Sequence, residues 1–205
     1  HSFPTRRSSD LHFLFNSLNA GAQLAMMEDA EQTGIFVEKM ADFFRYNVKK
    51  GQEDATLGEE LEAVDNYIYI LNVRFAGDIH FNKDVDESLE NVRVPSMILQ
   101  PVVENAVNHG IRDIEWEGKI HLTVTGDADY IRISVKDNGK GMTPEQIESV
   151  LSGNKEHCNE QSDSTGIGMN NVISRLELYY EEPGLVEINS DGENKGTEVV
   201  IYIPV

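Results

Sequence analysis

Three groups of residues, spread along the chain, combine carboxylate or amide side chains with closely spaced glycines. They are Glu104 with Asn105, the motif Asp137-x-Gly139-x-Gly141, and the pair Gly166-x-Gly168. A buried carboxylate accepts a hydrogen bond from the amine of adenine, backbone N–H groups bind phosphates, and amide oxygens bind magnesium. Each group alone is a weak signal, but their order along one chain predicts a site for ATP and Mg²⁺.

Asp137 follows an alternating apolar segment and leads into a glycine-rich turn. Its carboxylate is therefore the predicted acceptor for the adenine amine. Gly139 and Gly141 let the backbone approach the base without a Cβ and can take a positive φ. An ordinary hairpin turn is the alternative explanation of this motif, and the two other groups favour the nucleotide interpretation.

Asn105 lies in an apolar segment that is typical of a helix, and its amide oxygen is the predicted magnesium ligand. Asn108 and His109 follow three and four residues later, so a helix would place them on the same face, toward phosphates. Glu104 is predicted to order a metal-bound water. The alternative is a solvated polar face without a ligand.

The third group joins a polar loop to a segment typical of a helix, whose N-terminus would attract phosphate oxygens. Gly196 and Thr197 precede the last apolar segment and fit either a hairpin turn or an adenine contact. The complete set of predicted nucleotide ligands is Asn105, Asn108, His109, Asp137, Gly139, Gly141, Met142, Thr165, Gly166, Ile167, Gly168, Met169 and Thr197.

The first third of the chain is typical of helices. Apolar residues recur at helical spacing over residues 11–27, and a second such segment ends near Gly51. A third helix is expected to begin at Thr56 with a capping box and to end at Gly77. Its apolar positions Leu57, Leu61, Val64, Ile68 and Leu71 have near-heptad spacing, which favours a bundle, within one chain or between two.

After residue 78 the pattern changes to short alternating segments. Strands are expected at 79–81, 92–94, 120–124, 131–135, 186–188 and 199–203, with helices over 95–111, from Thr143 and after Gly168. Residues 152–165 read as a polar loop. These elements predict an α+β sandwich with one mixed sheet and helices on one face.

Composition restricts the function further. The chain has 205 residues and a formal net charge of −19, which argues against a nucleic-acid or anionic-membrane surface. Because ATP is also an anion, the site needs magnesium or a local cation. A single cysteine, Cys158, cannot form an internal disulfide and favours a reducing compartment. No segment reaches the roughly 18 apolar residues of a membrane span.

The chain divides into three predicted parts. Residues 1–10 begin with His1 and lack helical or strand periodicity, so they are interpreted as a non-native leader. Residues 11–78 form the helical region, and residues 79–205 form the nucleotide-binding domain, with a lid at about 143–165. On this interpretation the chain is a fragment, and whatever lay upstream is missing.

These motifs resemble a known family. Asn105, Asp137-x-Gly139-x-Gly141, Gly166-x-Gly168 and Gly196-Thr197 are similar to the conserved boxes of the GHKL ATPases, which include DNA gyrase and histidine kinases. The segment from His12 to Asn19 resembles the phosphoacceptor region of LytS-type sensor histidine kinases. The resemblance covers essentially all of residues 11–205.

The resemblance implies an ATP-dependent autokinase with a Bergerat-type sandwich. His12 would be the phosphoacceptor, with Asn16 and Glu104 as further catalytic residues, and the phosphoryl group would pass to an Asp of a response regulator. It also implies a homodimer, and a cytoplasmic catalytic portion of a parent protein in a bacterial inner membrane. The upstream sensor region would be absent from this chain.

His12, Asn16 and Asn19 recur at helical spacing, which would display the imidazole on a polar strip. The family usually has proline before the histidine and often an acid after it, whereas this chain has Leu11 and Phe13, so no general base is identified. Three alternatives remain: a hydrolysing GHKL ATPase, a serine kinase acting on an anti-sigma antagonist, and a non-catalytic nucleotide-binding dimerisation module.

Overall fold

The computed structural model describes residues 6–27, 30–49, 54–75, 79–112, 114–152 and 163–205, with the backbone alone at 6–15, 49 and 163–167. Its centre is a five-stranded sheet in the order β2-β4-β5-β7-β6. The strands are β2 (Ile79–Val85), β4 (Gly118–Gly126), β5 (Tyr130–Asp137), β6 (Val186–Asn189) and β7 (Glu198–Pro204). Only β2 and β4 pair in parallel, so the sheet is mixed, as predicted.

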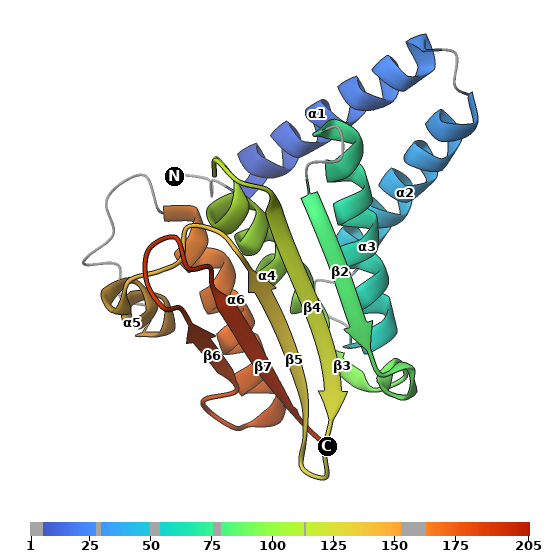
Figure 1. Cartoon of the computed structure of the whole chain (residues 1–205). Helices are drawn as coiled ribbons and strands as arrows, with labels where there is room; N and C mark the ends of the chain where they lie inside the picture. Colours follow the sequence, from blue (N-terminus) through green and yellow to red (C-terminus); the bar gives the residue numbers. More distant parts are fainter. Residues whose placement is uncertain (1–5, 28–29, 50–53, 76–78, 113, 153–162) are drawn as a thin grey trace, which may run out of the picture.

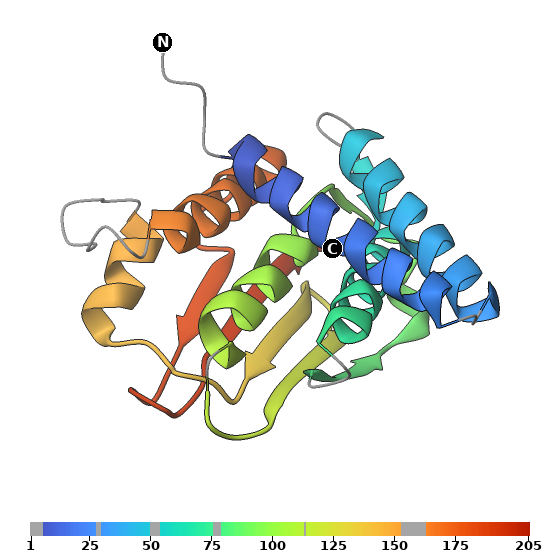
Figure 2. The same ribbon diagram turned by 90° about the horizontal axis from the view of Figure 1, so that it is seen from above.

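Helices cover one face of this sheet. In Figure 1, α3 (Leu57–Arg74), α4 (Leu99–Asn105) and α6 (Asp163–Tyr180) lie behind the strands, and Figure 2 gives the same arrangement from above. Burial alternates along β4, where Ile120, Leu122 and Val124 are buried and the residues between them are more exposed. One face is therefore packed and the other solvated, as is common in largely antiparallel sheets, and the α+β prediction is confirmed.

The N-terminal helices α1 (Arg6–Met26) and α2 (Ala30–Lys49) form a hairpin that projects beyond the sheet (Figure 1). Phe36 of α2 is fully buried, and a Cβ at Gly21 of α1 would lie 3.2 Å from its ring. Phe43 stacks on Tyr67 of α3, with 5.9 Å between ring centroids. These contacts join the hairpin to the core through α3.

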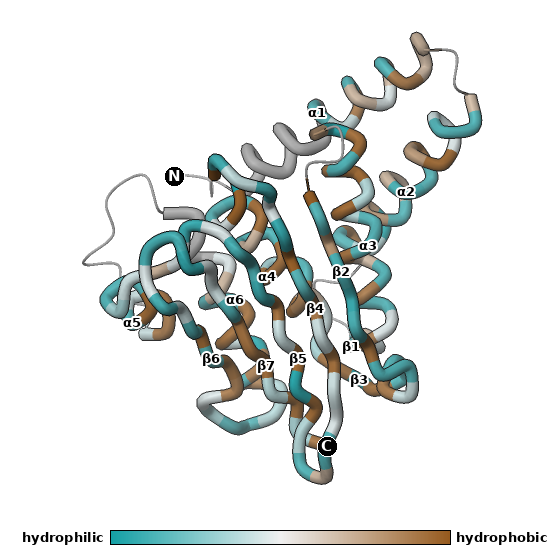
Figure 3. Tube along the Cα trace, in the orientation of Figure 1, coloured by the Kyte–Doolittle hydropathy of each residue, from teal (hydrophilic) through white to brown (hydrophobic). Residues whose placement is uncertain are grey.

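The hairpin also exposes apolar side chains. Figure 3 shows hydrophobic segments along both of its helices, among polar ones. Among the hairpin side chains that the structure describes, the exposed large hydrophobic residues are Leu18, Met26, Ile35, Val37 and Val48. A single chain therefore leaves apolar surface of this region in contact with water.

Helix α3 confirms its predicted start and its apolar stripe. The side chain of Thr56 accepts from the N–H of Glu59 at 3.2 Å, and the Glu59 carboxylate accepts from the N–H of Thr56 at 2.8 Å. This reciprocal pair is a capping box. All five predicted stripe residues are buried: Leu57, Leu61, Val64, Ile68 and Leu71.

Two expected helix starts before residue 100 differ in the structure. Helix α1 begins at Arg6, five residues before the expected start, while residues 1–5 lie outside the described part. The interpretation of residues 1–10 as a non-native leader stays a prediction. Pro95 does not open a helix; it ends β3 (Arg93–Pro95), which pairs with β1 (Asp54–Thr56), an unpredicted strand. Pairing between residues far apart in sequence overrides the local preference of proline for a first helical turn.

Two further helices differ from expectation. The helix predicted over 95–111 is α4 followed by a π-helical segment, η2 (Ala106–Ile111). Helix α6 begins at Asp163, before Gly166, whereas the sequence predicted a start after Gly168. Asp, Ser and Thr are favoured helix starters, and those types occupy residues 163–165. The shorter elements are α5 (Pro144–Ser152), which confirms the predicted start near Thr143, and the 3-10 turn η1 (Glu87–Leu89).

Candidate nucleotide site

Asp137, the last residue of β5, is the centre of the candidate site. It is 5% exposed, and its Oδ1 accepts from the N–H of Gly139 at 2.8 Å. Its own N–H donates to the carbonyl of Thr197 at 2.9 Å. Burial raises the pKa of Asp137, against the lowering effect of nearby backbone N–H groups. An additional donor, such as an exocyclic amine, would therefore stabilise this carboxylate.

Three glycines pack directly on Asp137 and its turn. A Cβ at Gly110 would lie 2.7 Å from Cγ of Asp137, and one at Gly196 would lie 2.1 Å from its carbonyl oxygen. A Cβ at Gly139 would lie 2.0 Å from the carbonyl oxygen of Gly110, which also accepts from the N–H of Lys140 at 3.0 Å. Side chains are excluded at all three positions, so backbone packs directly on the carboxylate at Gly110 and on the main chain of its turn at Gly196.

A second contact joins the Asp137 turn to the turn before β7. Gly141 has φ +68°, and a Cβ there would lie 2.0 Å from the carbonyl oxygen of Gly192. The hydroxyl of Ser190 accepts from the N–H of Met142 at 3.0 Å and donates to the carbonyl of Gly196 at 2.7 Å. Ser190 thus fixes the relative position of two turns. It was not predicted, because no local motif marks a serine that bridges distant turns.

Asn138 anchors the same turn to the start of β4. Its Oδ1 accepts from the N–H of Lys119 at 2.8 Å, and its Nδ2 donates to the carbonyl of Glu117 at 2.9 Å. The indole N–H of Trp116 donates to the Asn138 carbonyl at 2.8 Å. Neither Asn138 nor Trp116 was predicted to contribute, and both hold Asp137 in place without being ligand candidates themselves.

Asn105 ends α4 and is brought close to α6. A Cβ at Gly168 would lie 3.9 Å from Oδ1 of Asn105. The Nδ2 atom of Asn105 is buried and has no hydrogen-bond partner among the described residues. A buried unpaired amide costs about 1–3 kcal/mol, so this side chain is suited to a ligand. Glu104 accepts instead from Gln100 on its own helix, at 2.7 Å.

The π-helical segment η2 places His109 and Gly110 after Asn105. The N–H of Arg112 donates to the carbonyl of Val107 at 3.0 Å, a bond that spans five residues. Burial lowers the pKa of His109, and the positive charges of Lys140 and Arg112 lower it further. Its imidazole is therefore neutral at pH 7. Single-turn π segments are frequent at functional sites, and Lys140 and Arg112 bring positive charge close to this one in an acidic chain.

The remaining predicted residues fall into three groups. Asn108 is exposed on η2, and Thr197 is half-buried beside Asp137. Met169 is 2% exposed and belongs to the hydrophobic core, and its predicted contact with the nucleotide stays a prediction. The side chains of His12, Thr165 and Ile167 lie outside the described part, and the backbones of these residues and of Gly166 belong to α1 and α6. Asn16 is half-buried on α1.

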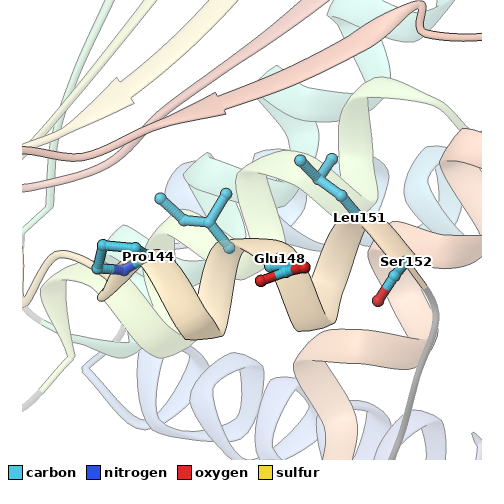
Figure 4. A pocket seen from close by; sticks show the side chains of 5 residues that line it. Pro144, Glu148, Leu151 and Ser152 are labelled. Atoms are coloured by element: carbon cyan, nitrogen blue, oxygen red, sulfur yellow. The ribbon is translucent and has the colours of Figure 1, made fainter.

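A separate apolar groove of about 560 Å³ follows α5 (Figure 4). It is lined by Pro144, Ile147, Glu148, Leu151 and Ser152. Helix α5 falls within the predicted lid, but none of these residues is a predicted ligand. The groove is therefore distinct from the surroundings of Asp137.

Comparison with known families agrees with this geometry. The family model described as "Histidine kinase" matches residues 9–79. The family model described as "Histidine kinase-, DNA gyrase B-, and HSP90-like ATPase" matches residues 93–205, more than half of the chain. The chain therefore belongs to the histidine kinase-, DNA gyrase B- and HSP90-like ATPases, with a histidine kinase region before the ATPase domain.

Curated relatives are sensor kinases by name. Sensor histidine kinase YpdA of Escherichia coli (strain K12) is 34% identical over 195 residues, which cover 94% of this chain and 32% of YpdA. Sensor histidine kinase YesM of Bacillus subtilis (strain 168) is 30% identical, over 94% of this chain and 31% of YesM. Sensor protein LytS of Streptococcus agalactiae is 29% identical, over 94% of this chain and 32% of LytS. The chain thus spans about a third of the length of these relatives.

Solved structures support the fold. The catalytic domain of histidine kinase ThkA superposes with a TM-score of 0.52 at 22% identity, covering 75% of this chain and 98% of that domain. The mycobacterial sensor histidine kinase MprB gives a TM-score of 0.53 at 17% identity, over 74% of this chain and 96% of that one. In the described part of the chain, no helix combines the length and apolarity needed to cross a membrane.

Replacing Gly110 by alanine should abolish nucleotide binding, because the new Cβ would overlap the Asp137 carboxylate. Gly34→Ala is the matched control: it lies in α2, nothing lies within 4 Å of its Cβ position, and alanine should favour the helix by about 0.5–1 kcal/mol. Isothermal titration calorimetry with Mg-ATP measures the affinity of both variants. Equal affinity of Gly110→Ala and the parent would refute the assignment of Asp137 to the site.

Proposed function

We propose that this chain is the catalytic portion of a two-component sensor histidine kinase, which phosphorylates His12 with ATP and passes the phosphoryl group to a response-regulator Asp. The observation that carries the proposal is the Asp137 carboxylate, which is buried against Gly110 and accepts from the N–H of Gly139. The histidine kinase region that precedes this site in the same chain supports phosphoryl transfer over simple hydrolysis.

The nucleotide is recognised at its base by Asp137. The adenine amine donates to the carboxylate, whereas guanine presents a carbonyl oxygen at the equivalent position and would be repelled. Glycines at 110, 139 and 196 let the backbone pack directly on Asp137 and its turn, which fixes the position of the carboxylate. Burial raises the pKa of Asp137, and a hydrogen bond from the adenine amine would favour its charged form.

Asn105 is the proposed magnesium ligand, through the oxygen of its amide. The described residues contain no group of three or more His, Cys, Asp or Glu side chains arranged to hold a metal. A magnesium ion would therefore take its other ligands from phosphates and water, which is its usual manner of binding with nucleotides. When bound, it neutralises phosphate charge, and Lys140, Arg112 and the polar Asn108 and His109 would assist on the η2 side.

His12 is the proposed nucleophile. The pKa of an unperturbed imidazole is about 6.5, so a neutral ring with a free lone pair is abundant at pH 7. The imidazole nitrogen bonds to the γ-phosphorus as the bond to the β-phosphate oxygen breaks and ADP departs. Asn16, one turn later on α1, and Glu104, next to Asn105, are proposed to position the reacting groups and an ordered water.

The proposal is tested by incubating the chain with γ-labelled ATP and Mg²⁺. We expect label that is lost in acid and kept in base, the behaviour of phosphohistidine, and no label on His12→Gln, which should still bind ATP. Acid-stable label would indicate a serine kinase. Phosphate release without labelled protein would indicate a hydrolysing ATPase. Absence of ATP binding would indicate a non-catalytic dimerisation module that keeps only the nucleotide-binding fold.

A homodimer is proposed to form through the helical hairpin. The exposed apolar residues of α1 and α2, such as Leu18 and Val37, support it, because apolar surface of this kind often marks an interface. Sedimentation velocity should give a dimer for the parent and a monomer for Leu18→Glu with Val37→Glu. The matched control is Leu178→Glu on α6, also an exposed leucine, which should leave the dimer intact. A monomeric parent would contradict the proposal.

The complete protein is proposed to reside in a bacterial inner membrane, with this portion in the cytoplasm. The sensor names of the longer relatives support this location. Protease digestion of spheroplasts carrying the full-length protein should spare this portion, and its digestion from outside would contradict the location.

A further inference from the structure

Glu60 of α3 is a carboxylate that is completely buried in the structure. Its oxygens accept from the backbone N–H groups of Met97 at 2.6 Å and of Ile98 and Leu99, each at 2.9 Å. These groups lie at the start of α4, where a helix has unsatisfied donors. A side chain from one helix thus caps another helix, 39 residues away in sequence at Leu99.

Tyr46 of α2 contacts the same carboxylate. Its hydroxyl donates a hydrogen bond to Oε1 of Glu60. Burial, followed by the negative charge of Glu60, raises the pKa of Tyr46 well above its ordinary value, so the hydroxyl remains protonated and remains a donor. The helix that packs on α1 is therefore tied by one side chain to the start of α4.

Arg175 of α6 holds the other side of this segment. Its guanidinium donates to the carbonyl of Ser96, directly before the three residues capped by Glu60. Met97 between them has φ 63°, a left-handed conformation that is uncommon for residues other than glycine. Residues 96–99 are thus held by opposite charges from α3 and α6, in a backbone conformation that those contacts stabilise.

The position of α4 determines the position of two residues of the candidate site, Asn105 and Gly110. The helix is only seven residues long, from Leu99 to Asn105, and it continues into η2 with Gly110. Gly110 packs on the Asp137 carboxylate, and Asn105 has the unpaired amide. A displacement at residues 97–99 would therefore move both ends of the candidate site, because a helix of two turns shifts as a unit.

We propose that Glu60 is a positioning residue that couples the nucleotide site to the helical hairpin: it fixes the start of α4 and, through the Tyr46 hydroxyl, transmits the state of α4 to α2. This inference rests on the proposed nucleotide site. Nucleotide binding at Asn105 and Gly110 orders α4. The hydrogen bonds from the α4 N–H groups then restrain the Glu60 carboxylate, and this carboxylate restrains the Tyr46 side chain. The hairpin that carries His12 is thereby restrained when nucleotide is bound.

The test is amide hydrogen exchange of the whole chain with and without Mg²⁺ and a non-hydrolysable ATP analogue. In the parent, nucleotide should slow exchange in the last two turns of α2 by about fivefold. In Tyr46→Phe this slowing should be lost, while the affinity for the analogue, measured on the same samples, stays within about twofold. Tyr46→Phe removes one hydroxyl and keeps the ring, so the packing of α2 is preserved.

Tyr202→Phe is the matched control, because it also removes a tyrosine–glutamate hydrogen bond, the one to Glu187 at 3.1 Å, on β7. It should keep the full nucleotide-dependent slowing in α2. If Tyr46→Phe also keeps it, while the parent binds the analogue, the coupling is refuted and the proposed function stands. A parent that does not bind the analogue refutes the proposed function and the coupling with it.

Glu60→Gln tests the α4 end of the same link. The amide has one acceptor oxygen and opposes N–H groups with its own donors, so the start of α4 loses acceptors that it cannot replace. We expect the affinity for the analogue to fall about tenfold. A folded Glu60→Gln chain with unchanged affinity and unchanged slowing in α2 would overturn the positioning role.

Discussion

The arrangement of the ATPase domain depends on the burial of one carboxylate, that of Asp137, against backbone where no side chain fits. Gly110 comes from the π-helical segment, Gly139 from the turn that follows β5, and Gly196 from the turn before β7. A carboxylate in such surroundings is costly unless it receives hydrogen bonds, and the raised pKa of Asp137 expresses that cost. Three chain segments must therefore meet correctly before an adenine amine can be bound.

Glu60 is a second buried carboxylate, and hydrogen bonds from the protein offset the cost of burying it. Its charge is satisfied by three N–H groups at the start of α4 and by Tyr46. The pKa of Asp137 remains raised by burial despite its backbone hydrogen bonds, so this carboxylate suits a further donor from a ligand. Glu60 accepts from four donors and suits a structural connection. The short helix α4 connects the two carboxylates. Glu60 caps its start at Leu99, and the helix leads through Asn105 and η2 to Gly110, which packs on Asp137.

The sequence predicted those parts of the site that local motifs encode. Asp137, Gly139 and Gly141 are adjacent, and the alternating strands and the capping box at Thr56 follow from residue types a few positions apart. Gly110, Ser190 and the π-helical segment were missed, because their roles come from contacts between distant turns. Pro95 was assigned to a helix for the same reason, since its pairing partner in β1 lies about 40 residues earlier.

The most direct test of the central claim compares ATP with an analogue that lacks the 6-amino group of the base. Calorimetry would measure the affinity of both, with Mg²⁺, for the parent and for Asp137→Asn. If Asp137 binds the amine, losing the amino group weakens binding to the parent about tenfold or more, and has little further effect on the variant. An equal loss in parent and variant would show that the amine binds elsewhere and would contradict the account.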